Sequence, residues 1–335
     1  MEHPDIQQLL LEKIQQRIAD HTKLADSMAE VLGLGLAATY RRMRGETPFR
    51  VEELVTLARH YQISLDQLIH QEQAGIVTFR SSILTRPNAQ MYDYLTQLRD
   101  ELRHLIALRI EEAIFSAKDI PALHLFAYPE LIRFKTFFWQ KSILNDPAVA
   151  HKKFTLQAPI FDEASFDELC REISTLYGQL PTTEIWNVET SFSILKQISY
   201  YAQAGLFERI QDAEALFDQT ELYFNNLRDM AQVGKKTILC PTSPGSFDLY
   251  INELVVPDNI IYARWAHGHM TYVINNSIEY MGATHEGFCQ HTRRWLENLK
   301  AKSELISVIS ELLRFQFFRR IQQRIDEARV RVSGF

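Results

Sequence analysis

Residues 24–69 carry the clearest pattern in this chain, LADSMAEVLGLGLAATYRRMRGETPFRVEELVTLARHYQISLDQLI. Apolar residues recur there at spacings of three and four, which is typical of short amphipathic helices. The run Gly33-Leu34-Gly35 interrupts the pattern. We expect Gly33 to end one helix in the left-handed conformation and Leu34 to fill the corner before the next. The stretch therefore predicts four helices, at about 23–32, 36–44, 51–61 and 64–69.

A further helix is expected upstream of this stretch. Residues 5–19 carry isoleucines and leucines at the same spacing, which gives one apolar stripe. With this helix, residues 1–72 form an all-α domain of five helices. The two helices that flank the glycine break have the arrangement of a helix-turn-helix.

The helix at 36–44 is the one whose surface can be predicted. With Leu36, Tyr40 and Met43 in the core, a rotation of about 100° per residue turns the other side chains outward. This face holds small residues and arginines: Ala37, Ala38, Arg41 and Arg42. The pattern fits two rotational settings of this helix that differ by one residue. In the second setting Thr39 faces the core and Tyr40 faces outward.

Such a surface suits the major groove of DNA. Small residues allow close approach to base edges, and a guanidinium can donate two hydrogen bonds to guanine or to a phosphate. Arg44, at the end of this helix, and Arg50 flank the turn at 45–48, and Lys23 lies before the glycine break; contacts to the DNA backbone are expected from these three residues. The candidate DNA-binding residues are Lys23, Ala37, Ala38, Thr39, Arg41, Arg42, Arg44 and Arg50.

Several spaced features of this region resemble a known family. They are the run A-E-V-L-G at 29–33, R-G at 44–45, and the pattern L-x-x-L-A-x-x-Y-x-I-S-L-D-x-L-I at 54–69. Together they resemble the Cro/phage-repressor-type (XRE) helix-turn-helix family. The resemblance implies a five-helix DNA-binding domain, often dimeric, whose third helix enters the major groove. Gly35 stands where that family usually has serine or asparagine.

After a short polar segment at 71–75, the spacing of apolar residues changes. Helices are expected at 91–108, 129–144, 166–177, 185–204, 213–231, 287–300 and 303–330, and strands at 76–84, 113–116, 237–240, 249–256, 260–266, 271–275 and 277–282. The turn signals between the later strands predict a small antiparallel meander. Residues 76–330 are therefore expected to form a larger α+β domain. This architecture resembles HTH transcriptional regulators of the Bacteroidetes type, an analogy that implies regulation.

Two clusters in this second part are candidate sites. His267, His269, His285, Cys289 and His291 include pairs that share a face of a strand or helix, so a zinc site is geometrically conceivable. No C-x-x-C or H-E-x-x-H pattern supports it, and we expect no metal and no cofactor. Phe134, Phe137, Phe138 and Trp139 can line a ligand pocket, although aromatic residues at helical spacing more often form core.

The composition restricts the class of protein. The chain has 335 residues, is 46% hydrophobic and has a formal net charge of −6, which does not exclude nucleic-acid binding because the placement of basic groups decides it. No apolar run is long enough for a membrane span, and the N-terminus has no signal-peptide pattern. Three widely spaced cysteines favour no disulfide framework. A cytoplasmic protein without membrane association is therefore expected.

These observations lead to one main hypothesis and two alternatives. The chain is expected to be a dimeric bacterial transcriptional regulator and not an enzyme. Its partners would be double-stranded DNA, a second copy of itself and a small-molecule effector. One alternative is a protein- or ligand-binding scaffold that uses the helix-turn-helix as an interaction module. The other is a metal-dependent enzyme with a DNA-targeting head.

Overall fold

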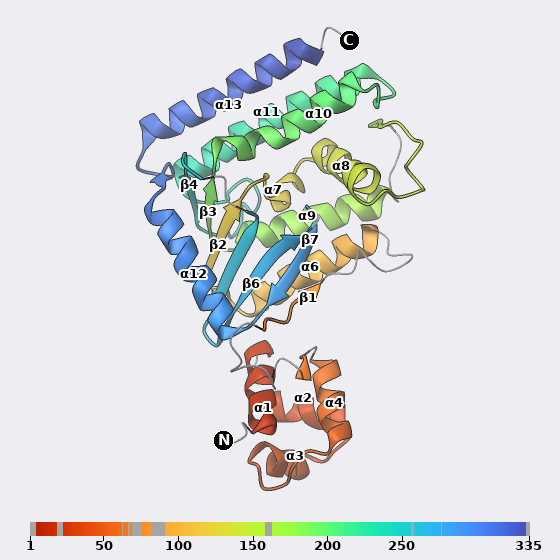
Figure 1. Ribbon diagram of the computed structural model, residues 1–335, viewed down its shortest axis with the longest axis vertical. Coiled ribbons are helices and arrows are strands. Elements are labelled where there is room, and N and C mark those ends of the chain that lie inside the picture. Colours follow the sequence, from red (N-terminus) through yellow and green to blue (C-terminus); the bar gives the residue numbers. More distant parts are fainter. Residues whose placement is uncertain are drawn as a thin grey trace.

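The computed structural model describes residues 5–18, 23–61, 63–65, 68, 76–81, 91–157, 163–255, 258–275 and 277–332. It consists of a small helical unit at one end and a larger unit built around a sheet (Figure 1). We call the described residues between 5 and 68 the head, and those between 76 and 332 the body. The N-terminus belongs to the head, and the C-terminus lies at the opposite end of the molecule.

The head contains the first four expected helices. These are α1 (Ile6–Arg17), α2 (Leu24–Leu32), α3 (Leu36–Met43) and α4 (Val51–His60). Of the helix expected at 64–69, only Ser64, Leu65 and Leu68 belong to the described residues. The helices enclose a small apolar core of Leu10, Ile14, Leu24, Met28, Phe49, Leu57, Ile63 and Leu68.

Local interactions set the ends of these helices. The Asp5 carboxylate accepts a hydrogen bond of 3.0 Å from the backbone N–H of Gln7 and so caps α1. Gly33 ends α2 with φ of 63°, which confirms the expected left-handed C-cap. The Gln7 amide donates to the carbonyl of Arg42 (2.6 Å) and accepts from the N–H of Phe49 (2.8 Å). α1 therefore holds the segment that joins α3 to α4.

The body is built on one mixed sheet. Its strands are β1 (Arg80–Ser81), β2 (Glu112–Ala117), β3 (Thr182–Trp186), β4 (Phe247–Ile251), β5 (Ile260–Trp265), β6 (Gly268–Asn275), β7 (Glu279–Ala283) and β8 (Glu304–Leu305), in the order β1-β7-β6-β5-β2-β3-β4-β8. β2, β3 and β4 are parallel, whereas β5, β6 and β7 form the expected antiparallel meander. The short strands β1 and β8 pair antiparallel at the two edges.

Helices cover both faces of this sheet. They are α6 (Met91–Ala107), α7 (Ala122–Leu125), α8 (Pro129–Phe138), α9 (Glu163–Gln179), α10 (Ser193–Gln203), α11 (Ile210–Val233), α12 (Glu286–Ala301) and α13 (Glu311–Val332), with a π-helical turn η2 (Trp139–Ile143) and a 3-10 turn η3 (Val188–Phe192). Alternation along β2 separates two cores: Ile114 packs with Cys289 and Leu296 of α12, and Phe115 belongs to the main core on the other face. α10, α11 and α13 lie at the end of the body away from the head (Figure 1).

The sheet is larger than the small antiparallel one that the sequence predicts. Residues 185 and 186 were expected to begin a helix, but they end the parallel strand β3, and α10 starts only at Ser193. Both Ile185 and Trp186 are fully buried, and a continuous apolar run does not distinguish a buried strand from a buried helix. The expected strand at 237–240 is also wrong. The carbonyl of Lys236 accepts from the N–H groups of Leu239 and Cys240, which makes this segment a turn.

None of the helices in the described ranges combines the length and the apolar composition that crossing a bilayer requires.

Candidate nucleic-acid interface

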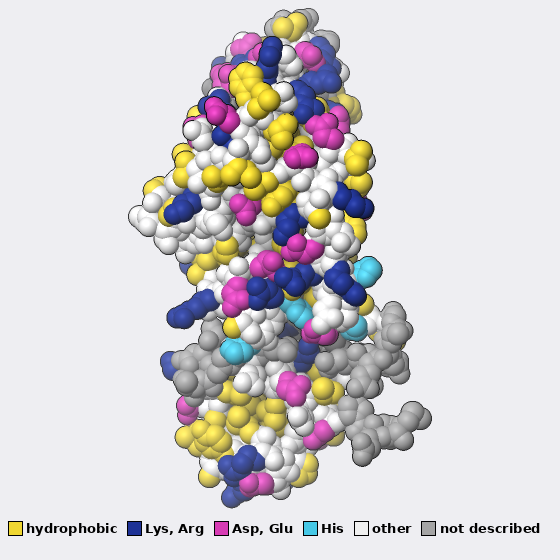
Figure 2. Space-filling model, turned by 90° about the vertical axis from the view of Figure 1, so that its left-hand side faces the viewer, with side chains coloured by type: hydrophobic (Ala, Val, Ile, Leu, Met, Phe, Trp, Pro, Cys, Tyr) yellow, Lys and Arg dark blue, Asp and Glu magenta, His cyan; other side chains and the backbone are white. Residues whose placement is uncertain are grey.

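α3 lies at the end of the head that is farthest from the body (Figure 1). Seen from one side, this end of the molecule carries Lys and Arg side chains next to acidic and hydrophobic ones (Figure 2). Gly35, in an extended conformation, precedes the helix and provides no side-chain cap. The helix is therefore held by its packing against α2 and by contacts from the following segment, and its outer face is accessible to a large partner.

The phase of α3 differs by one residue from the first expectation. Thr39 is fully buried and its hydroxyl donates to the carbonyl of Gly35 (3.3 Å), whereas Leu36 and Tyr40 are each 46% exposed. Placing Leu36 and Tyr40 in the core was therefore wrong, and the exchange of Thr39 with Tyr40 is confirmed. The hydrogen bond to Gly35 satisfies the buried hydroxyl, so Thr39 can lie on the inner side of α3 without an unpaired polar group.

Of the residues expected on the outer face, the structure exposes two and turns the other two inward. Ala37 and Arg41 are exposed, whereas Ala38 and Arg42 are half-buried. Within the described part of the chain, the guanidinium of Arg41 makes neither a hydrogen bond nor an ion pair.

Arg42 has an internal partner, so placing it on the outer face was wrong. Its guanidinium donates Nε to Glu53 Oε2 and Nη2 to Glu53 Oε1, each at 2.9 Å. Both side chains are largely withdrawn from solvent, with 13% and 16% exposed. Glu53 also accepts from the N–H of Arg50, and these interactions lower the pKa of its carboxyl against the opposing effect of burial. Arg42 therefore fixes α3 against α4.

The expected phosphate contacts lie at the rim of this surface. Arg44 is exposed just after α3 and pairs with the exposed Glu46 at 2.6 Å. Arg50 is exposed at the start of α4, and Lys23 is exposed immediately before α2. An exposed ion pair such as Arg44–Glu46 is weak, so a phosphate can replace the carboxylate at little cost.

Two of the candidate zinc ligands have other partners in the structure. His269 on β6 lies 3.0 Å from Glu286, between Nε2 and a carboxylate oxygen. His285 is the N-cap of α12, where its Nδ1 accepts from the N–H of Phe288 (3.1 Å). That bond occupies one of the two ring nitrogens that a metal site would use or orient.

The remaining zinc candidates are not gathered around a common point. Cys289 is buried, its thiol donates to the carbonyl of Ala283, and burial raises its pKa to about 11. His267, in the β5–β6 turn, and His291, on α12, are both exposed. In the described ranges, no three His, Cys, Asp or Glu side chains are grouped so that they could hold a metal ion.

The aromatic residues of α8, and Trp139 at the start of η2, belong to the core or pack against it. Phe134 is fully buried and packs edge-on against Phe154 and Tyr201, and Phe137 and Trp139 are also buried. None of these side chains is among the residues that line the cavities described below. The interpretation as core is therefore the one that the packing supports.

A closed polar network in the body was not foreseen from the sequence. Glu184, fully buried on β3, accepts hydrogen bonds from His124 Nε2 (2.9 Å), from Trp186 Nε1 (3.0 Å) and from the hydroxyl of Tyr177. The ammonium of Lys236 donates to the carbonyl of Tyr177 (2.9 Å) and lies 3.8 Å from the centre of its ring. Burial lowers the pKa of Lys236 to about 7. His124 and Lys236 are far in sequence from Tyr177, Glu184 and Trp186, so no local spacing indicates the whole network.

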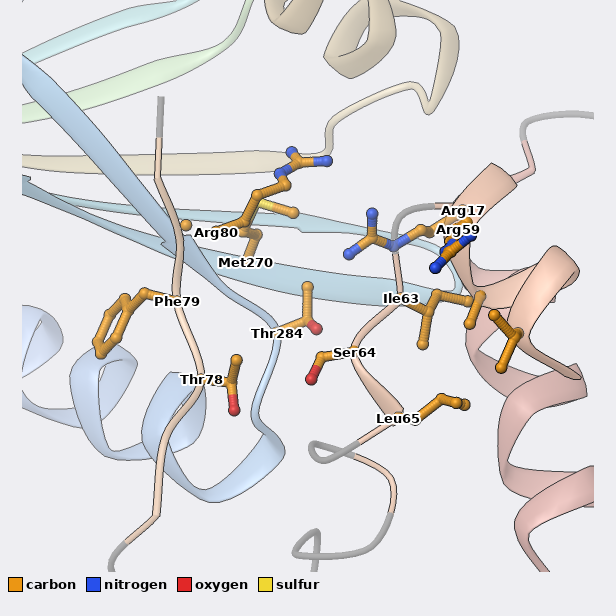
Figure 3. Close-up of a pocket in the computed structure, with 13 residues that line it drawn as sticks. Arg17, Arg59, Ile63, Ser64, Leu65, Thr78, Phe79, Arg80, Met270 and Thr284 are labelled. Atoms are coloured by element: carbon orange, nitrogen blue, oxygen red, sulfur yellow. The ribbon is translucent and has the colours of Figure 1, made fainter. Parts of the chain in front are cut away.

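The junction of head and body holds a second feature that no motif indicates. A cavity of about 490 Å³ lies there, lined on the head side by Arg17, Arg59 and Ile63. In Figure 3 these side chains approach from one side, and Arg80, with neighbours from the sheet, approaches from the other. Arginines of both units thus face the same space.

Comparison with known proteins identifies the N-terminal region. A family model described as the BetR domain matches residues 5–101, which include α1 to α4, β1 and the first part of α6. This region is thus similar to a helix-turn-helix-type regulator domain, and the narrower XRE assignment is not confirmed. Searches among curated proteins and among solved structures gave no significant match.

Proposed function

We propose that this protein is a sequence-specific transcriptional regulator that places the exposed face of α3 in the major groove of DNA. One observation carries the proposal. Arg41 projects beside the small Ala37 from a helix at the free end of a head that matches a DNA-binding regulatory domain. Because the body lies behind the head, nothing in the described part of the chain obstructs the approach of a duplex to this face.

The residues take different parts in this proposal. Arg41 donates to a base edge or a nearby phosphate, and Ala37 lets the helix approach the bases. Tyr40, at 46% exposure, adds a phenol to the same face. Arg44, Arg50 and Lys23 contact the DNA backbone, and their contribution falls as salt rises. Arg42 and Thr39 act indirectly, because they hold α3 in place.

The decisive experiment is genome-wide mapping of the DNA fragments that the full-length protein binds. Binding to the fragments found is then measured by fluorescence anisotropy at two salt concentrations. A regulator gives a small set of sites, with an affinity that falls steeply as salt rises. Equal binding to all fragments, or none, contradicts the proposal.

A second candidate function rests on the exposed apolar residues of α3. Leu36 and Tyr40 are exposed side by side with Arg41, and such a surface also suits a helix of another protein. In that case a Leu36→Glu variant loses the partner protein, while Arg41→Ala retains it. If α3 contacts DNA, Arg41→Ala is instead the variant that loses the partner, and Leu36→Glu retains it.

The proposal includes a dimer, because one small head covers few base pairs and two heads read half-sites about 34 Å apart. The supporting surface is the start of α13, where exposed hydrophobic residues are concentrated: Val308, Ile309, Leu312 and Phe315. α13 starts at the left edge of Figure 1, and hydrophobic side chains gather in the upper half of that side of the molecule (Figure 2). A two-fold axis that runs along this side, parallel to the long axis of the molecule, would relate the two copies. Both heads then lie at the same end of the dimer.

A further inference from the structure

The body contains a large cavity between α6 and the sheet, with a volume of about 840 Å³. One wall is the inner face of the sheet, including Phe115, Ile261 and Tyr272, and the other is α6, including Leu98 and Leu102. This volume lies within the range of small-molecule sites, which are mostly apolar with a few polar groups. The space is therefore of a size and character suited to a ligand.

Small residues on the sheet create this space. Ala113 of β2 and Ala263 of β5 are cross-strand partners and both line the cavity. Gly282 of β7 pairs with Tyr272, and a Cβ atom at Gly282 would come within 3.3 Å of the Tyr272 ring. Larger residues at these three positions would fill the volume. The cavity therefore exists because these three residues are small.

One part of the lining is charged and carries two arginines, Arg17 and Arg80, and two carboxylates, Asp100 and Glu101. Arg80 pairs with Glu101 at 3.0 Å, and Asp100 pairs with Arg99 at 2.8 Å. Glu101 also accepts from the hydroxyl of Tyr272 (2.6 Å). Both carboxylates thus form their ion pairs with arginines other than Arg17. Glu101 still acts on Arg17 electrostatically, but among the described residues the Arg17 guanidinium forms no ion pair with a carboxylate.

Arg17 comes from the head and not from the body. It is at the C-terminal end of α1, and its Nη1 donates to the carbonyl of Tyr61 (3.2 Å). Burial, and after it the neighbouring charge of Arg80, lowers the pKa of Arg17 to about 10. An anion placed here would relieve both effects. Arg17 and Arg80 also line the junction cavity of Figure 3, so the two cavities meet at these arginines.

We propose that this cavity binds a small amphipathic organic acid, whose apolar body lies between α6 and the sheet and whose carboxylate pairs with Arg17. Such a ligand contacts the body through its apolar part and the head through its acid group. Binding therefore ties the head to the body in one arrangement. This regulatory consequence rests on the proposed DNA-binding function, whereas binding of the ligand does not.

Ligand binding is tested without DNA, by isothermal titration calorimetry on the full-length protein. The probes are decanoate and 2-naphthoate, each compared with its neutral alcohol, decan-1-ol and 2-naphthylmethanol, below concentrations at which they aggregate. At least one acid is expected to bind tenfold or more tightly than its alcohol. Equal affinities, or no binding of either acid, overturn the proposal.

Variants then locate the site. Arg17→Gln is expected to weaken binding of the acid at least tenfold and to leave the alcohol unchanged, with Arg319→Gln on the far helix α13 as the matched control. Ala263→Leu fills the cavity and should abolish binding of both; Ala113→Leu serves the same purpose if the first variant does not fold. If Arg17→Gln binds the acid like the parent protein, the assignment of the carboxylate is wrong.

The effect on regulation is measured separately. Anisotropy with a fragment from the genomic mapping is recorded with and without the bound acid, and the acid should change the DNA affinity severalfold in the parent protein but not in Arg17→Gln. An acid that binds in calorimetry without changing the DNA affinity contradicts the coupling and leaves the site in place. A protein that binds the acid but no DNA contradicts the proposed function alone.

Discussion

Arg42 and Glu53 join α3 to α4 through two parallel hydrogen bonds of 2.9 Å between guanidinium and carboxylate. The same carboxylate accepts the backbone N–H of Arg50, at the start of α4. One glutamate thus fixes both the orientation of the helix that presents Arg41 and the first turn of the next helix. The outer surface of the head depends on this half-buried pair.

Replacing Arg42 by alanine should loosen the head. The variant leaves the Glu53 carboxylate without its guanidinium, and the free energy of opening of α3 and α4 should fall by about 1–3 kcal/mol. Hydrogen exchange of the backbone amides of these helices measures it. Arg44→Ala, which breaks the exposed pair with Glu46, is the control and should leave exchange unchanged. Equal protection in both variants would show that the pair does not hold α3.

Replacing Arg41 by alanine should weaken DNA binding without altering the head. If Arg41 contacts a phosphate, the variant lowers the slope of log affinity against log salt by about 1; if it contacts a base, it costs about 1–3 kcal/mol and relaxes specificity at one position. Anisotropy with specific and scrambled duplexes separates the two. Arg319→Ala on α13 is the matched control. Parent-like binding by Arg41→Ala would exclude this residue from the interface.

Glu184→Gln should destabilise the body strongly. The carboxylate accepts from His124, Tyr177 and Trp186 in a fully buried site, and an amide cannot accept all of these bonds. We expect a loss of about 3 kcal/mol in the free energy of unfolding, as for other broken buried charge networks. Urea unfolding followed by tryptophan fluorescence measures it. The exposed Glu189→Gln is the control, and a loss no larger than in that variant would contradict the prediction.

The stability of the body should rise with pH above neutrality because of Lys236. Its pKa is about 7 in the folded protein, against 10.5 for an ordinary lysine. Between these values the unfolded chain holds a proton that the folded chain does not, so raising the pH favours folding by up to about 1.4 kcal/mol per pH unit. This gain is absent below pH 7.

The comparison that isolates this effect is with Lys236→Met, which cannot titrate. Urea unfolding at pH 7, 8 and 9 should show the parent protein gaining stability relative to the variant at each step. Parallel pH profiles for the two proteins would mean that Lys236 keeps an ordinary pKa. Lys196→Met, at an exposed position on α10, should give a profile parallel to that of the parent.

Phe315→Glu should prevent the proposed dimer. Phe315 is 60% exposed on α13, and a carboxylate there would be buried against the second copy. Sedimentation velocity should show a dimer for the parent protein and a monomer for the variant, while hydrogen exchange of the head stays unchanged. The exposed Tyr200→Glu on α10 is the control. A parent protein that sediments as a monomer, or a variant that stays dimeric, contradicts this interface.

The head was largely predictable because its signals are local. The glycine break at Gly33 and the apolar spacing of α1 to α4 each involve residues a few positions apart. The phase of α3 was not decided locally. Leu36 and Tyr40 are the larger apolar residues, yet Thr39 is the one buried, and its hydroxyl is bonded to the carbonyl of Gly35.

The body was predictable only in part. The β5–β6–β7 meander is connected by short turns, so its signals too are local. The strands expected at 113–116 and 249–256 overlap β2 and β4. Their parallel pairing through β3 joins segments that are far apart in the chain and separated by helices, so no short-range pattern indicates the pairing. The end of β3 was expected to be the start of a helix because a buried apolar run does not distinguish a strand from a helix.

By itself, the sequence determined that a helix-turn-helix unit occupies the N-terminal region and that an α+β unit follows, because helical periodicity and turn residues act over a few positions. Only the tertiary structure decided which side of α3 faces outward, that Arg42 is bound to Glu53, and that Ala113, Ala263 and Gly282 leave a cavity beside Arg17. These features depend on packing between segments that are distant in sequence, where the size and charge of the opposing side chain determine the result.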